Sequence, residues 1–151
     1  MFKARLLTIL TAMMPVAELR GAIPAGVGFG LSLPESFVLS IIGNILPIPF
    51  VILFTRSIFA WLRTKSKWLN AFVNKMEAKA EKNKDVVLKY QFWGLVLLVA
   101  IPLPGTGAWT GGMVASMLDM QLKRAMPAII LGVLIAGVIV LSITLGAITI
   151  F

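Results

Sequence analysis

The chain of 151 residues contains no cysteine and no histidine, and it carries few charges. The first two absences exclude disulfides, thiol chemistry, haem and metal sites built on imidazole ligands. Charged residues make up 13% of the chain and hydrophobic residues 59%, and the mean hydropathy is +0.96. Soluble domains have roughly 45–50% apolar and about 25% charged residues, so this composition indicates an integral membrane protein.

Basic residues outnumber acidic ones and give a net charge of +8. Most of them gather in segment 61–89, at Arg63, Lys65, Lys67, Lys75, Lys79, Lys82, Lys84 and Lys89. A lysine and arginine excess in one connecting segment places that segment in the cytoplasm. We therefore attribute the positive charge to membrane orientation and anionic lipid headgroups, and we expect no nucleic-acid partner.

Two uncharged stretches, residues 36–55 and 125–151, are long enough for membrane-spanning helices, which need about 20 residues. The second contains small residues that suit close helix packing, namely Gly132, Ala136, Gly137 and Gly146. Whether they pack within one chain or between two chains stays open.

A third uncharged stretch, 90–118, would be about 44 Å long as one helix, against a bilayer core of about 30 Å. Its middle contains Pro102, Pro104, Gly105 and Gly107, and proline interrupts a regular helix. We predict a re-entrant hairpin of two half-helices, 90–101 and 108–118. Irregular backbone at such depth persists only where protein or water satisfies it.

The N-terminal third repeats this order. A half-helix at 2–14 is followed by a break that contains Pro15, Gly21 and Pro24, and a second half-helix is expected at 25–33. Pro24 suits a first helical turn. The sequence thus predicts an all-α membrane domain in which a re-entrant hairpin and a spanning helix occur twice.

The repeats are residues 1–60 and 90–151 of one membrane domain, joined by 61–89. With the linker in the cytoplasm, the two repeats have opposite orientations, as in many transporters. The linker itself is predicted to be an amphipathic helix lying in the membrane interface, with a solvated loop as the alternative. Its apolar stripe comprises Trp61, Leu62, Leu69, Phe72 and Met76.

Glu18 and Arg20 are the only charges between Leu6 and Pro34, and we place both near the tip of the first hairpin. Ionisable groups at such depth are costly and usually mark a substrate or ion pathway. Glu18 could gain and lose a proton, and Arg20 could hold a phosphate or carboxylate. The alternative is a structural ion pair between the hairpin tips. Residues two apart on a helix do not face each other, so direct pairing requires irregular backbone.

The second hairpin supplies Thr106, Trp109 and Thr110 as further site candidates. Asn44, in the first spanning helix, is another, although a lone amide there more often bonds a neighbouring helix. Half-helix starts present free amides and favour an anion, whereas Glu18 favours a cation, so the substrate's charge stays open. Without a carboxylate cluster or nucleophile–base pair, we expect no metal, no cofactor and no enzymatic activity.

Three motifs resemble the family of small multidrug export proteins: "ELRGAIPAG" (18–26), "GNILPIPF" (43–50) and "PLPGTGAWTGG" (102–112). That family is distantly similar to the DedA membrane proteins, which share the hairpin-plus-helix unit. The resemblance implies proton-dependent transport, or recycling of polyprenyl-phosphate carriers. Glu18 matches an acidic residue that DedA proteins place in their first hairpin. Their second tip carries arginines that "IPLPGTGAWT" lacks, and Arg20 could replace them from the first hairpin.

We therefore expect a multi-pass protein of a bacterial or archaeal cytoplasmic membrane, in contact with lipids and assembled as a homodimer. The expected function is proton-coupled secondary transport of a small amphiphile or lipid headgroup. A polyprenyl-phosphate flippase is the second hypothesis within transport. A non-transporting membrane scaffold, in which the same charges only lock the hairpins together, is the hypothesis from another class.

Overall fold

The structure is a computed structural model that describes residues 2–14, 17–101, 107–118 and 120–150. Side chains are described for all of these except 56, 79–80 and 82–88. The described part of the chain is helical and contains no strand. Its helices are α1 (Phe2–Met13), α2 (Glu18–Gly28), α3 (Leu33–Ile45), α4 (Ile48–Arg63), α5 (Lys67–Tyr90), α6 (Phe92–Ala100), α7 (Ala108–Met117) and α8 (Leu122–Ile150).

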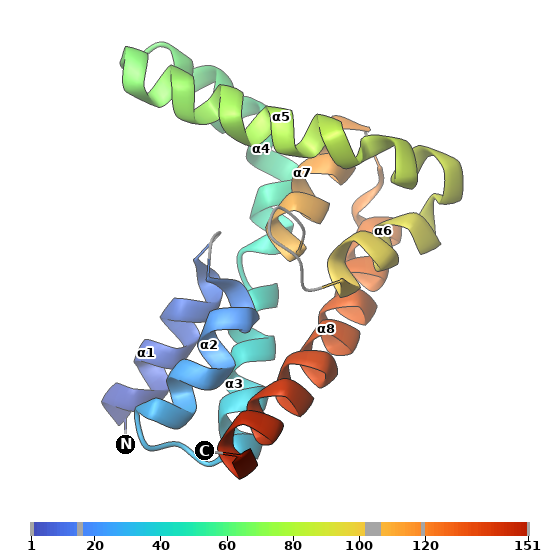
Figure 1. The fold of residues 1–151 in the computed structure, drawn as a ribbon. Helices are drawn as coiled ribbons and strands as arrows, with labels where there is room; N and C mark the ends of the chain where they lie inside the picture. Colours follow the sequence, from blue (N-terminus) through green and yellow to red (C-terminus); the bar gives the residue numbers. More distant parts are fainter. Residues whose placement is uncertain (1, 15–16, 102–106, 119, 151) are drawn as a thin grey trace.

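The helices form two groups connected by the long α8 (Figure 1). In the first group α1, α2 and α3 pack on one another, and α8 runs beside α3. In the second, α6 packs on α8, and α7 packs on α4. Helix α5 lies across the end of the molecule opposite the two chain termini and contacts α4, α6 and α7. The predicted all-α architecture is confirmed.

Among the described residues, two stretches are long and apolar enough to cross a membrane, Leu33–Thr55 and Leu122–Ile150. Helix α8 buries a stripe of small and branched residues that includes Ala128, Gly132 and Ala136. Its other side exposes large apolar side chains, among them Leu134, Ile135, Val138, Ile143 and Leu145. A continuous apolar surface of this kind is rare on a soluble monomer and fits contact with lipid.

The first predicted spanning helix, 36–55, is interrupted. Helix α3 ends at Ile45 and α4 begins at Ile48, with Pro47 as its N-terminal flanking residue. Pro47 and Pro49 have no backbone N–H to donate, and their position accounts for this interruption. The apolar stretch ends at Thr55 as expected, while α4 itself continues to Arg63, the third residue of the segment assigned to the linker.

The first hairpin differs from its prediction in where the helix resumes. Helix α2 begins at Glu18, so Gly21 and Pro24 lie inside it and not in a break that extends to residue 24. The expected half-helix at 25–33 was therefore wrong. Proline removes only one donor here and its ring points to the exposed side, while Ala22, Ile23 and Gly26 are buried. Burial of that face outweighs the local preference of proline.

The two helices predicted for the second hairpin are present, with bounds within two residues of those expected. Helix α6 covers Phe92–Ala100, and α7 covers Ala108–Met117. Gln91 has a φ of 51°, and this left-handed residue separates α6 from the end of α5. Predicted tip residues Pro15, Pro102, Pro104 and Gly105 lie outside the described residues.

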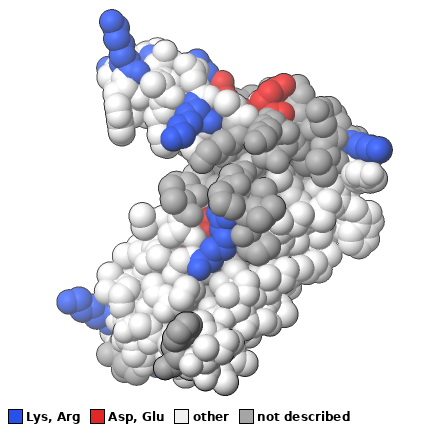
Figure 2. All heavy atoms as spheres, in the orientation of Figure 1, with Lys and Arg blue, Asp and Glu red and all other residues white. Residues whose placement is uncertain are grey.

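The linker contains a long helix, α5, as predicted, and the loop alternative was wrong, but the helix begins only at Lys67. Trp61 and Leu62 of the predicted stripe belong to the end of α4. Val73 is fully buried, and Met76 packs against the core. Trp68 and Phe72 stack on each other on a more exposed side, with ring centroids 6.4 Å apart. Figure 2 shows charged side chains around this end of the molecule and a largely uncharged surface below it.

Two glycines make equivalent close approaches. A Cβ on Gly43 of α3 would lie 2.6 Å from the carbonyl oxygen of Ile9 and 2.9 Å from the Cβ of Ala12, both in α1. A Cβ on Gly132 of α8 would lie 3.0 Å from the carbonyl oxygen of Val96 and 2.6 Å from the Cβ of Val99, both in α6. In both cases the glycine allows the first helix of a hairpin, α1 or α6, to pack closely on α3 or α8. The contact is made by two residues of α1 or α6 that are three positions apart.

Candidate functional site

Glu18 joins the two hairpins. It is the first residue of α2 and is only 2% exposed, although it carries a carboxyl group. Its Oε1 accepts a hydrogen bond of 3.0 Å from the backbone N–H of Trp109, in the first turn of α7. The first N–H groups of a helix have no partner within the helix and form its positive end. The carboxylate therefore caps α7 from a position 91 residues away in the chain.

Gly107 makes this contact possible. It precedes α7 with φ 117° and ψ −172°, a conformation almost restricted to glycine. A Cβ at this position would overlap Oε2 of Glu18. The carboxylate thus packs directly on the backbone at the start of α7.

Arg20 completes the charged group. Its guanidinium nitrogen lies 3.7 Å from Oε2 of Glu18, and its side chain is 23% exposed. Glu18 has a φ of 49°, so the backbone at the start of α2 is left-handed. Because the backbone is irregular here, the side chains of Glu18 and Arg20 can pair although they are only two residues apart. The 3.7 Å separation is long for a charge-assisted hydrogen bond, which measures about 2.7–2.9 Å.

Asn44 lies beside this pair. It is 2% exposed on α3, and its Oδ1 has no hydrogen-bond partner among the described residues. Asn44, Glu18 and Arg20 line the same small cavity of about 10 Å³. That volume is near the minimum for one water molecule, which would need polar partners such as these. The predicted candidates Glu18, Arg20 and Asn44 therefore lie together in the structure.

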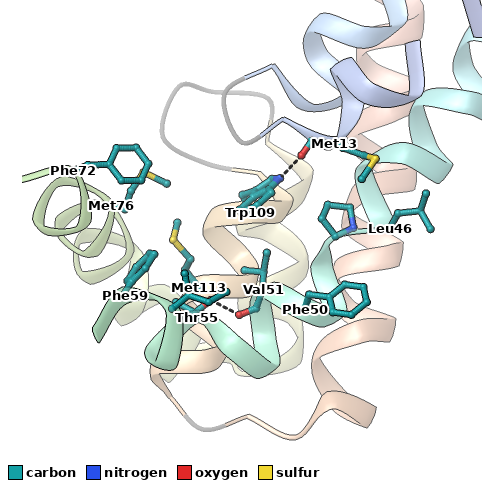
Figure 3. A pocket seen from close by; sticks show the side chains of 12 residues that line it. Met13, Leu46, Phe50, Val51, Thr55, Phe59, Phe72, Met76, Trp109 and Met113 are labelled. Atoms are coloured by element: carbon teal, nitrogen blue, oxygen red, sulfur yellow. Dashed lines mark hydrogen bonds between the residues drawn. The ribbon is translucent and has the colours of Figure 1, made fainter. Parts of the chain in front are cut away.

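Trp109 connects the charged group with a second, larger cavity. Its indole N–H donates a 3.0 Å hydrogen bond to the carbonyl oxygen of Met13, at the end of α1 (Figure 3). Both residues line an apolar cavity of about 410 Å³. Trp109 thus contacts the first hairpin twice, through its backbone at Glu18 and through its ring at Met13. Trp109, one of the predicted site candidates, therefore both lines a cavity and packs against the end of α1.

We call this space the methionine–aromatic cavity. Its described lining consists of three methionines, four aromatic residues and five others: Met13, Met76, Met113; Phe50, Phe59, Phe72, Trp109; Leu46, Pro47, Val51, Thr55 and Ile58. These residues come from the end of α1, from α4, α5 and α7, and from the α3–α4 junction, and Figure 3 shows their side chains around a common space. Apart from Trp109, sequence reasoning missed this lining, because no local motif unites it.

Two further residues predicted for the site are the threonines Thr106 and Thr110. Thr110 is buried within α7 and lines neither cavity. Thr106 lies outside the described residues. No group of three or more acidic residues that could hold a metal ion occurs in the part of the chain that the structure describes.

One family model matches residues 18–139, and its description is "Putative small multi-drug export protein". The match begins at Glu18 and covers the charged group, the methionine–aromatic cavity except Met13, and most of α8. The chain matches no curated protein and no solved structure.

Proposed function

The chain belongs to the small multi-drug export protein family, and from this premise we propose that it is a proton-coupled secondary transporter of a small amphiphile. The observation that carries the proposal is the buried carboxyl group of Glu18, held between the two hairpins. A titratable group in such a place is the usual mark of an ion pathway in a membrane protein. Arg20 and Asn44 would accompany it, and protons would supply the driving force.

The proposal includes an inverted repeat of hairpin and spanning helix. Support comes from the order of the elements, with α1, α2, α3–α4 followed by α6, α7, α8. The equivalent close approaches at Gly43 and Gly132 add independent support. The basic linker, assigned to the cytoplasm by its charge, would then orient the repeats oppositely across a bacterial or archaeal cytoplasmic membrane. A distant relation to the DedA proteins is consistent with this arrangement.

The alternatives have different support. A polyprenyl-phosphate flippase needs an anion site, but the start of α7, where an anion would be expected to bind, is already capped by Glu18. The non-transporting scaffold is favoured by that same contact, because a cap between two hairpins is a structural element in its own right. We keep the scaffold as the second candidate.

A homodimer remains part of the proposal, since the helices are few for enclosing a pathway. Gly132 and Gly137 would not form its interface, because a Cβ on either would collide with side chains of the same chain. Gly146 of α8 has open space around it.

The test is flux in sealed proteoliposomes under an imposed pH gradient, comparing the natural chain with Glu18→Gln. A polyprenyl phosphate is followed in one sample and a cationic dye in another. We expect gradient-driven movement of the dye that the substitution abolishes while the protein stays folded. Absence of movement for both compounds, with both proteins folded, would favour the scaffold.

A further inference from the structure

The methionine–aromatic cavity has a size and lining suited to a small ligand. Its volume of about 410 Å³ falls within the range of about 300–1,000 Å³ typical of ligand pockets. Methionine side chains adapt to ligands of different shape because they are unbranched and flexible. The aromatic rings come from different helices, so that they can contact a ligand from several directions (Figure 3).

The polar groups of the described lining are already satisfied. The hydroxyl of Thr55 donates to the carbonyl oxygen of Val51, and the indole N–H of Trp109 donates to that of Met13. A ligand that brings hydroxyl, amide or phosphate groups would lose their hydration without gaining partners. The cavity thus disfavours a polar headgroup and favours an aromatic ligand whose charge, where it has one, is spread over a large volume.

The sign of that charge follows from the surroundings. The described lining contains no lysine or arginine side chain, whereas the faces of Phe50, Phe59, Phe72 and Trp109 carry the negative part of the ring quadrupole. Beside the cavity, Glu18 accepts a hydrogen bond from the backbone N–H of Trp109, and Arg20 lies 3.7 Å from the same carboxylate, so this pair adds little net charge. The faces of the rings attract a cation. We propose that this cavity binds lipophilic aromatic cations and is the substrate chamber of the transporter, an inference that rests on the proposed function.

In this proposal Trp109 connects the substrate chamber with Glu18, the group that would carry the proton. Its ring forms part of the chamber wall, and its backbone N–H donates a hydrogen bond to the carboxyl group of Glu18. A cation that moves the ring must also disturb the bond to Glu18 or the bond to Met13. Substrate binding and the contact between the two hairpins are therefore coupled through one residue.

The first experiment measures equilibrium binding to the purified full chain in detergent micelles, without any gradient. The probes are tetraphenylphosphonium and tetraphenylborate, which have nearly the same size and shape and opposite charge. We expect the cation to bind at least about tenfold more tightly than the anion. Equal affinities, or tighter binding of the anion, would overturn the proposal. Loss of cation binding on addition of a neutral phospholipid would also overturn it, since the occupant would then be an acyl chain.

Matched variants locate the binding. Phe59→Leu removes a ring from the chamber, and we expect about fivefold weaker cation binding, the size of one cation–π contact. Phe54→Leu is the control, because Phe54 lies on the same helix, is 46% exposed and is not among the lining residues. An equal loss of cation affinity in the two variants would mean that the cation binds to the detergent micelle and not in the cavity, and it would overturn the proposal.

Should Phe59→Leu not fold, Ile58→Lys provides a second variant at the partly exposed rim, with Ile58→Gln as its control. The lysine should weaken binding of the cation and strengthen that of the anion, and unchanged affinities would overturn the proposal. Because binding is measured without transport, the experiments test the transport function and the substrate chamber independently. Binding without flux in proteoliposomes would overturn the transport function alone, and gradient-driven flux of another amphiphile without cation binding would overturn the chamber alone.

Discussion

Replacing Glu18 by glutamine and by alanine should have very different effects on stability. Glutamine keeps an oxygen that can accept the N–H of Trp109, so it loses only the attraction between a negative charge and the positive end of α7. That attraction contributes about 0.3–1 kcal/mol near a helix end, and up to about 2 kcal/mol where partly buried. The ion pair with Arg20 is long at 3.7 Å and partly exposed, so its loss adds about 0–1 kcal/mol.

Alanine removes the acceptor altogether. The N–H of Trp109 then has no partner in a buried place, which costs about 1–3 kcal/mol, in addition to the lost charge. We therefore expect Glu18→Ala to lower the free energy of unfolding by roughly 2–4 kcal/mol. At about 2–4 °C per kcal/mol for a chain of this size, the melting temperature should fall by about 4–16 °C.

The assay is thermal unfolding of both purified variants in the same detergent, followed by circular dichroism. We expect the melting temperature of the natural chain to be slightly above that of Glu18→Gln, and that of Glu18→Gln to be well above that of Glu18→Ala. If glutamine and alanine melted together, the hydrogen bond to Trp109 would not be what Glu18 contributes. If both matched the natural chain, the contact between hairpins would contribute nothing to stability.

Four further substitutions test the packing of glycines and the bond of Trp109, and each is checked by the same unfolding measurement. Gly132→Ala should destabilise by about 1–3 kcal/mol, because its Cβ would meet Val99, whereas Gly146→Ala should be neutral or stabilising by up to about 1 kcal/mol; equal effects would refute the close packing of α6 on α8. Gly107→Ala should cost at least about 1–3 kcal/mol from backbone strain, and a neutral result would contradict its left-handed conformation. Trp109→Phe should lose about 0.5–1.5 kcal/mol with the indole bond to Met13, and no loss would mean that the bond is not formed.

Local chemistry predicted the parts of the fold that depend on neighbouring residues. Proline and glycine between α6 and α7 located the ends of these two helices within two residues. Pro24 misled the same reasoning, because the buried residues around it keep α2 helical across a missing donor. A local rule fails where packing against other helices outweighs it.

Contacts between distant residues could not be predicted in the same way. The sequence marked Glu18 and Trp109 separately as unusual, but nothing in it indicated that one caps the helix that carries the other. The methionine–aromatic cavity is an extreme case, because its lining is assembled from α1, α4, α5 and α7. Its methionines and phenylalanines are ordinary apolar residues until the fold brings them together.

The capping contact serves both the scaffold and the transporter, and the difference is whether it opens. Protonation of Glu18 would remove its attraction to the start of α7, and about 1 kcal/mol changes a ratio of two states about fivefold. Glu18→Gln imitates the protonated form. The chain has no native cysteine, so spin labels on Met14→Cys and Leu97→Cys, both exposed, report the distance between the hairpins cleanly.

For a transporter, we expect the glutamine background to populate a second distance that is minor in the natural chain. The control is Phe54→Leu, at an exposed position of α4, which should leave the distance distribution unchanged. A single, identical distance in the natural and glutamine backgrounds would show that the charge of Glu18 does not regulate the contact. The hairpins would then be permanently joined, and the buried carboxyl group would be a structural cap.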